Sequence, residues 1–167
     1  VVEMGDRMVP RMMTEVAGNL IKKWVEKKGI AVHTNTKVES ITQSQSGLLV
    51  KLSNGETIEV DLVISATGVK PNIEFLKNSG LQIQTGILVN EQMQTSHPDI
   101  YAAGDVTESV DFCTGERIIN AIQPNAADQA SIAASNMAGG HASAVGSLQV
   151  NVLDTLGLIS SSFGQWS

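Results

Sequence analysis

The residues best placed for chemistry are Gly104 and Asp105, which follow a short apolar run at residues 100–103. The run predicts a strand, and a glycine at its end lets the backbone approach a ligand closely. A carboxylate projected from a strand end can accept hydrogen bonds from a polyol, such as the ribityl chain of a flavin. The pair is equally typical of a turn with a capping aspartate, so both interpretations stay open.

A second candidate is the small-residue turn Ala66, Thr67 and Gly68, which follows an apolar run at residues 61–66. The run predicts a strand buried on both faces. Open α/β sheets bind ligands at the carboxyl edge of their strands, and small residues allow a cofactor close to the backbone. A plain strand-to-loop turn is the alternative interpretation.

A third candidate is Glu3, which ends a short β-branched run and precedes the turn at Gly5. In a dinucleotide-binding fold, an acid at this place accepts hydrogen bonds from the adenosine ribose of NAD, and its charge would repel the additional phosphate of NADP. Arg7 complicates the preference for NAD, because a nearby guanidinium could meet a phosphate. An ordinary surface glutamate is the alternative.

Helical periodicity and turn residues predict the elements of the first half of the chain, which would position Glu3. A helix is expected to open near Pro10 and to stop at Gly29, followed by a strand at residues 30–32. Strand-like runs at residues 38–41, 48–52 and 57–60 predict an antiparallel meander, with a hairpin at Asn54-Gly55. The apolar stripe expected for the helix consists of Met13, Val16, Ala17, Leu20 and Trp24.

The second half of the chain predicts shorter elements. Asn72 is expected to cap a short helix through residue 76, and residues 86–89 to form a strand. Pro124 is expected to open a helix of small residues at 125–137 that Gly139 ends. Residues 141–147 are typical of a linker, and residues 148–152 and 157–161 are expected to be strands.

Composition excludes several classes of function. The chain has 167 residues, of which 42% are apolar and 17% charged, and its net charge of -6 argues against nucleic acid. A single cysteine, Cys113, fits a reducing cytoplasm, and its acidic surface hairpin predicts a structural or incidental role. His33, His97 and His141 are dispersed, which predicts no metal site, and no apolar run is long enough to cross a membrane.

The ordered segments 61–72, 89–96 and 98–105 resemble the pyridine nucleotide–disulfide oxidoreductases, which are flavoproteins with two dinucleotide-binding folds. The branch that they resemble includes NADH oxidases, coenzyme A disulfide reductases, and the flavoprotein components of rubredoxin and nitrite reductases. The resemblance implies an α/β fold with two Rossmann-like domains and a third, interface domain. Residues 1–70 would be the later half of the NAD domain, residues 71–140 the closing part of the FAD domain, and residues 141–167 a linker and the start of the interface domain.

The same resemblance implies a role for each candidate residue. Glu3 would hold the NAD ribose, and Ala66, Thr67 and Gly68 would line the NAD side of the sheet. Gly104 and Asp105 would bind the ribityl–phosphate region of FAD. The helix that opens at Pro124, Asn125 and Ala126 would direct its positive end at the flavin pyrimidine ring, where reduced flavin is negative.

The activity implied is transfer of a hydride from NAD(P)H to FAD and then of electrons to oxygen, a disulfide or a redox protein, in a homo-oligomer. No Gly-x-Gly-x-x-Gly loop and no initial methionine occur in this sequence. A carboxyl-terminal fragment without its pyrophosphate-binding loops is therefore expected, one that self-associates through exposed strand edges and binds neither cofactor alone. No catalytic residue is identified, and a non-catalytic nucleotide-binding or assembly module is the alternative.

Overall fold

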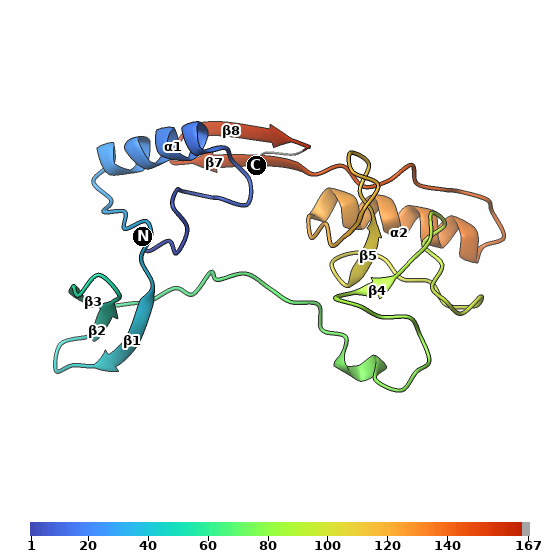
Figure 1. Cartoon of the computed structure of the whole chain (residues 1–167), viewed down its shortest axis with the longest axis horizontal. Helices are drawn as coiled ribbons and strands as arrows, with labels where there is room; N and C mark the ends of the chain where they lie inside the picture. The colour runs from blue at the N-terminus through green and yellow to red at the C-terminus, as the bar shows by residue number, and fades with distance from the viewer. Residues whose placement is uncertain (165–167) are drawn as a thin grey trace. The chain divides into compact units, whose positions relative to one another are not determined.

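The computed structural model describes residues 1–164, which form two compact units (Figure 1). The first unit contains Val1–Thr67 and Asn151–Ser162. The second unit contains Gly68–Val150 together with Phe163 and Gly164. Each unit has its own hydrophobic cluster.

The first unit opens with irregular turns and the helix α1, Glu15–Lys27. The helix begins five residues later than Pro10, the predicted start, because Thr14 is the N-cap and its side chain accepts from the Ala17 amide at 3.4 Å. The preceding residues instead form a turn in which the Met13 amide donates to the Val9 carbonyl at 3.1 Å. The predicted stop is confirmed, since Gly29 follows the helix with φ +86°.

The core of the first unit includes only part of the predicted stripe of α1. Met13 is buried and Ala17 packs against the cluster, whereas Val16 is 73% exposed and Leu20 59% exposed. The prediction was therefore wrong for Val16 and Leu20, since the buried residues of the helix are Gly18, Ile21 and Val25.

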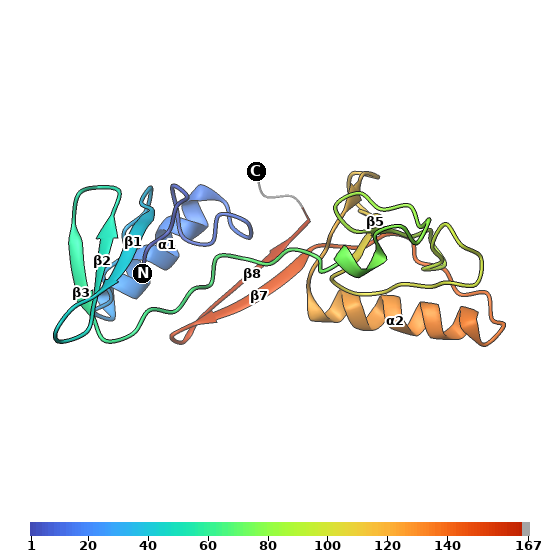
Figure 2. The ribbon, with the colours of Figure 1, turned by 90° about the horizontal axis from the view of Figure 1, so that it is seen from below.

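Two short parallel segments and a meander complete most of the first unit. The Glu3 amide donates to the His33 carbonyl at 2.8 Å and the His33 amide to the Val1 carbonyl at 2.9 Å, which is a single parallel bridge. Figure 2 shows the predicted antiparallel meander of β1 (Val38–Gln43), β2 (Leu48–Leu52) and β3 (Thr57–Val60). The turn between β2 and β3 needs glycine, because Gly55 has φ +90°.

The meander carries one carboxyl with a perturbed acidity. The pKa of Glu59 on β3 is lowered, because the hydroxyls of Ser46 and Ser44 in the β1–β2 turn hydrogen-bond to its carboxylate. These bonds join the turn to the far strand of the meander across β2.

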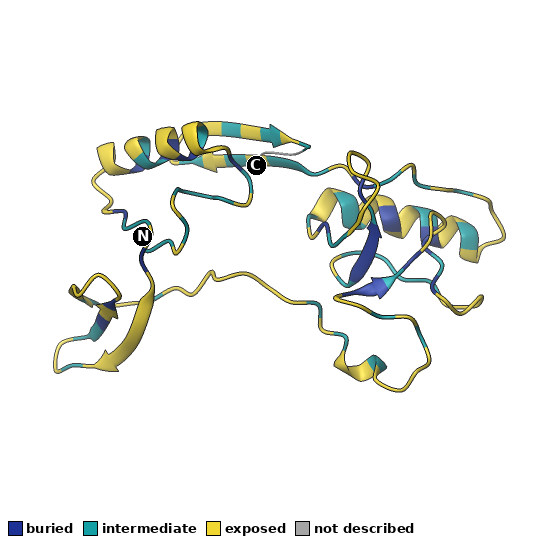
Figure 3. Cartoon of the chain, in the orientation of Figure 1, coloured by how far each residue is buried: buried dark blue, intermediate teal, exposed yellow. Residues whose placement is uncertain are grey.

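The segment after β3 differs from its prediction. Residues 61–66 were expected to form a strand buried on both faces, but they are extended and unpaired, and Leu62 is 72% and Ile64 81% exposed (Figure 3). A strand needs a hydrogen-bonded neighbour, and none of residues 1–164 is paired with this segment.

The second unit contains η1 (Glu74–Leu76), a three-stranded sheet and the helix α2 (Gln123–Met137). In the sheet, β5 (Thr107–Val110) is parallel to β4 (Ile87–Leu88) and antiparallel to β6 (Arg117–Ile118). The hydrophobic cluster of this unit consists of Ala133, which lies on α2, together with Val89 and Met93.

Several details of the second unit correct the sequence predictions. Residues 100–103 were predicted to form a strand, but they make only an isolated bridge, between Tyr101 and Gln94. The next strand, β5, begins at Thr107. Asn72 does not cap η1, whose N-cap is Ile73. The expected linker at residues 141–147 is packed rather than free, since the Ser147 amide donates to the Val110 carbonyl at 2.8 Å.

The last described elements are strands, as predicted, and they form a hairpin. β7 (Val150–Thr155) and β8 (Leu158–Phe163) make a two-stranded sheet. In the first unit, the Trp24 indole donates to the Thr155 carbonyl at 2.9 Å, and Leu158 packs against the cluster of α1. Among the described helices, none is long and apolar enough to cross a membrane.

Two adjacent residues of α1 allow a test of its orientation. Ile21→Ala is expected to lower the free energy of unfolding by about 2–5 kcal/mol, because Ile21 is 2% exposed and its removal leaves a cavity. Leu20→Ala, the matched control, is expected to change it by less than about 0.5 kcal/mol. Denaturant unfolding of both variants measures the difference, and equal losses would contradict the described face of α1.

The perturbed carboxyl of Glu59 gives a second test. Ser46→Ala is expected to raise the Glu59 pKa toward its ordinary value, because it removes the largest cause of the shift. A lowered pKa in the folded state stabilises the fold above the unfolded-state pKa, and this contribution is lost as the pH falls through the folded-state value. An NMR pH titration of the carboxyl checks the shift, with Ser40→Ala on exposed β1 as the control. An unchanged Glu59 pKa in the first variant would contradict the assignment.

Candidate functional site

The Gly104-Asp105 segment of the second unit is a tight turn that leads into β5. The Gly104 carbonyl accepts from the Thr107 amide at 2.9 Å and lies 2.8 Å from the Thr107 hydroxyl. Gly104 has φ +86°, a conformation that side chains rarely adopt, and Asp105 at the apex is exposed. Asp105 therefore stands at the start of β5 rather than at the end of the strand predicted before it.

The amino end of α2 lies against this turn. A β-carbon built on Gly104 would be 3.6 Å from the β-carbon of Ala126, which is ordinary van der Waals contact. The structure thus brings together two sets of residues that sequence analysis had placed at one ligand from separate motifs: Gly104 with Asp105, and Pro124, Asn125 and Ala126.

The amino end of α2 has no side chain that neutralises its positive end. Its N-cap is Ile122, which makes no side-chain capping bond, and its first turn contains no acidic residue. Pro124 has no amide hydrogen, and the Asn125 side chain donates instead to the Asn120 carbonyl at 2.9 Å. An uncapped helix start of this kind favours a negatively charged or electron-rich neighbour.

Sequence analysis missed Gln129, which joins the turn to the helix. Gln129 is 4% exposed, its Oε1 accepts from the Gly104 amide at 2.8 Å, and its Nε2 donates to the Ser109 hydroxyl at 3.1 Å. The signal that could have found it is helical spacing: Gln129 lies four residues before the buried Ala133, so it occupies the core face of α2.

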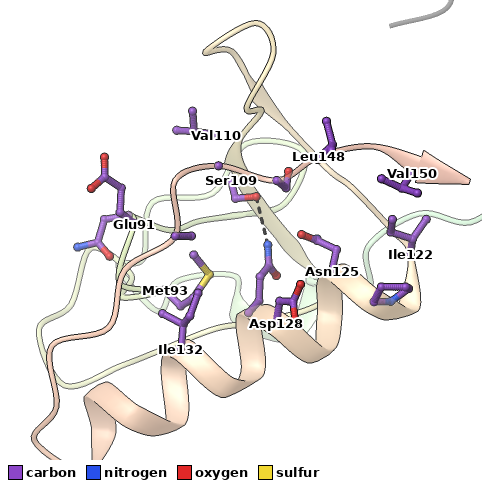
Figure 4. Close-up of a pocket in the computed structure, with 16 residues that line it drawn as sticks. Glu91, Met93, Ser109, Val110, Ile122, Asn125, Asp128, Ile132, Leu148 and Val150 are labelled. Carbon is purple, nitrogen blue, oxygen red and sulfur yellow. Dashed lines mark hydrogen bonds between the residues drawn. The ribbon is translucent and has the colours of Figure 1, made fainter. Parts of the chain in front are cut away.

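A cavity of about 270 Å³ lies on the same helix, between α2, the loop at residues 90–93 and the segment at 144–150 (Figure 4). Met93, Ser109, Gln129 and Ile132 line it, and Ser147 contributes a buried hydroxyl for which residues 1–164 provide no hydrogen-bond partner. Neither Gly104 nor Asp105 lines this cavity.

In the first unit, Glu3 is fixed by the turn that follows it. Its Oε1 accepts from the Gly5 amide at 2.7 Å, and the side chain is partly exposed. Gly5 cannot be replaced easily, because a β-carbon there would lie 2.9 Å from Cγ of Pro10. The other carboxylate oxygen of Glu3 makes no hydrogen bond within the described residues, so it can accept one from a ligand.

Arg7 is held by its own neighbours. Its Nε donates to the Met13 carbonyl at 3.0 Å, and its Nη1 pairs with an Asp6 carboxylate oxygen at 3.0 Å. Ala66 and Thr67 lie in the exposed segment after β3, and no hydrogen bond among residues 1–164 connects them to Glu3. Gly68, which follows them, is the first residue of the second unit and is also exposed. Within the first unit, the structure therefore orders Glu3 and Arg7 but forms no hydrogen bond between them and Ala66 or Thr67.

Cys113 is exposed in the turn between β5 and β6, where its amide donates to Asp111 at 3.0 Å. No group of three metal-ligating side chains occurs in the part of the chain that the structure describes.

Comparison with known proteins places this geometry in a family. Residues 1–132 match the family described as pyridine nucleotide-disulphide oxidoreductase. The chain is 41% identical over 140 residues to an NADH oxidase of Methanocaldococcus jannaschii, covering 83% of this chain and 31% of that protein.

Solved structures of related oxidoreductases resemble this chain. A NAD-dependent persulfide reductase from A. fulgidus superposes with a TM-score of 0.94 at 33% identity, covering 99% of this chain and 31% of that one. A FAD-dependent pyridine nucleotide-disulphide oxidoreductase from Desulfovibrio vulgaris matches with a TM-score of 0.85 at 29% identity, covering 92% and 39%. The predicted α/β fold class is thereby confirmed, and the chain spans about a third of the length of these proteins. Over that span, this chain belongs to the pyridine nucleotide–disulphide oxidoreductase family.

Proposed function

We propose that this chain is part of an oxidoreductase that moves electrons from NADH through bound FAD to an acceptor. The observation that carries the proposal is the contact between the Gly104-Asp105 turn and the uncapped start of α2. The two groups suit different parts of one flavin nucleotide, and relatives named as NADH oxidase, NAD-dependent and FAD-dependent proteins support the choice of cofactors.

The turn and the helix would hold FAD through complementary charges. The exposed Asp105 carboxylate would accept hydrogen bonds from the ribityl hydroxyls, and Gly104 leaves room for the backbone to approach. The positive end of the α2 dipole, at Pro124, Asn125 and Ala126, would stabilise negative charge on the pyrimidine side by up to about 2 kcal/mol, while the Ala126 amide itself donates to the Ile122 carbonyl at 3.1 Å. Bound FAD would supply the chemistry of accepting a hydride and passing electrons onward.

Glu3 would select NADH in the first unit. Its ordered carboxylate would accept hydrogen bonds from the adenosine ribose and repel a 2′-phosphate. Arg7 would not offset that repulsion, because its guanidinium is engaged by Asp6 and the Met13 carbonyl. Ala66, Thr67 and Gly68 would line the NAD side of the sheet.

The assignment of regions follows from these roles. Residues 1–70 would serve NAD, residues 71–140 would serve FAD, and residues 141–167 would link to an interface domain in a homo-oligomer. The acceptor would be oxygen, a disulfide or a redox protein, and the single cysteine favours the reducing cytoplasm as the compartment.

The flavin assignment predicts a difference between two glycine variants in the longest polypeptide that contains this chain. The unaltered protein should be yellow, and Gly104→Ala should weaken FAD binding by about tenfold or more, because a side chain disfavours φ +86° by about 1–2 kcal/mol. Gly139→Ala imposes a similar strain at φ +88°, in open space beyond α2, and should leave FAD affinity unchanged.

Titration of flavin fluorescence measures both affinities. Equal FAD affinity for the two glycine variants would contradict the role of the turn. A well-folded but colourless protein at saturating FAD would instead favour the non-catalytic module.

The nicotinamide assignment predicts a change in coenzyme preference. Glu3→Gln should lower the ratio of kcat/KM for NADH to that for NADPH by about tenfold, or about 1.4 kcal/mol, because the charge that repels the phosphate is removed. Glu26→Gln, on the exposed side of α1, is the matched control and should leave the ratio unchanged. Steady-state kinetics with both coenzymes checks this expectation, and an unaltered ratio in Glu3→Gln would remove Glu3 from the site.

A further inference from the structure

We infer that Gln129 is a positioning residue that fixes the Gly104-Asp105 turn relative to the start of α2, and thereby sets the spacing of the two groups proposed to hold FAD. The inference rests on the proposed function, because it assumes that these groups share one flavin nucleotide. It assigns a role to a buried side chain that would not itself touch the nucleotide.

The hydrogen bonds of Gln129 divide into two arms. The Oε1 arm accepts from the Gly104 amide at 2.8 Å and lies 2.9 Å from the Thr107 hydroxyl, so it reaches the turn. The Nε2 arm donates to the Ser109 hydroxyl at 3.1 Å, so it reaches β5. Figure 4 shows this second bond running from the helix to the strand.

The hydrogen bonds of Gln129 to Gly104 and Ser109 form a clamp between the turn and β5, and burial strengthens these bonds. Gln129 and Thr107 are 4% and 2% exposed, so water does not compete for their hydrogen bonds. A leucine or methionine would fill the same face of α2 without hydrogen-bonding partners, and the Gly104 amide would then be left without its acceptor. A glutamine at this core position is therefore explained by the turn it holds rather than by packing.

With the clamp, both backbone polar groups of Gly104 are hydrogen-bonded. The carbonyl of Gly104 is held by the Thr107 amide and hydroxyl, while its amide is held by Gln129. With both backbone groups fixed, the left-handed turn has one position relative to the helix, and Asp105 at its apex stands at a fixed distance from the α2 amides.

The two arms allow a matched experiment in the longest polypeptide that contains this chain. Gln129→Met keeps the length of the side chain and removes both arms, whereas Ser109→Ala removes only the partner of the Nε2 arm. We expect Gln129→Met to bind FAD about tenfold more weakly, with an altered visible circular dichroism of the flavin, and Ser109→Ala to stay within about threefold of the unaltered protein.

Each result decides the inference. FAD affinity of Gln129→Met within threefold of the unaltered protein would overturn it, and so would an equal loss in Ser109→Ala, since that loss would reflect general packing. If Gln129→Met does not fold, Gln129→Glu replaces it: a carboxyl oxygen still accepts from Gly104, so FAD affinity should stay within about threefold, and a tenfold loss in a folded Gln129→Glu would also overturn the clamp.

Failure of the proposed function is distinguishable in the same assay. A folded, unaltered protein that stays colourless with saturating FAD overturns both the flavin assignment and the clamp. A yellow protein whose FAD affinity does not change in Gln129→Met overturns the clamp alone.

Discussion

The second unit depends on how one glycine is held against one helix. Gly104 must adopt a left-handed conformation, and its amide points at the buried face of α2, where only a hydrogen-bond acceptor can satisfy it. Gln129 supplies that acceptor, and a β-carbon added at Gly104 would reach van der Waals contact with Ala126, so the turn lies close to the helix. The Gln129 hydrogen bonds connect the turn that carries the exposed Asp105 to the helix whose start is uncapped.

The local signals in the sequence predicted the parts of the fold that are determined locally. The Asn54-Gly55 pair predicted the hairpin between β2 and β3, and glycines 29 and 139 ended both helices with positive φ. These features depend on the conformational freedom of one residue, so neighbouring sequence is enough to find them. The strands β7 and β8 were also predicted, although their pairing was not.

The wrong predictions concern features that depend on distant partners. The buried face of α1 is decided by contacts with Val32 and Leu158, which helical periodicity alone does not contain. The apolar run before Ala66 predicted a buried strand, but a strand also requires a neighbour, and residues 1–164 supply none. In the candidate site, Gly104 and Asp105 were proposed from residue type and position, and the start of α2 from the family resemblance. Gln129 was missed because a glutamine in a small-residue helix gives no sign of the amide it meets across the unit.

The bond between the Trp24 indole and the Thr155 carbonyl joins positions 131 residues apart within the first unit. During synthesis, α1 therefore emerges long before the hairpin that supplies this acceptor and the packing of Leu158. Contacts of such high sequence separation delay the final packing, and the apolar face of the helix remains partly uncovered in the meantime. The first unit is thus expected to consolidate only after residues 68–150 have left the ribosome, and until then α1 is open to proteases and chaperones.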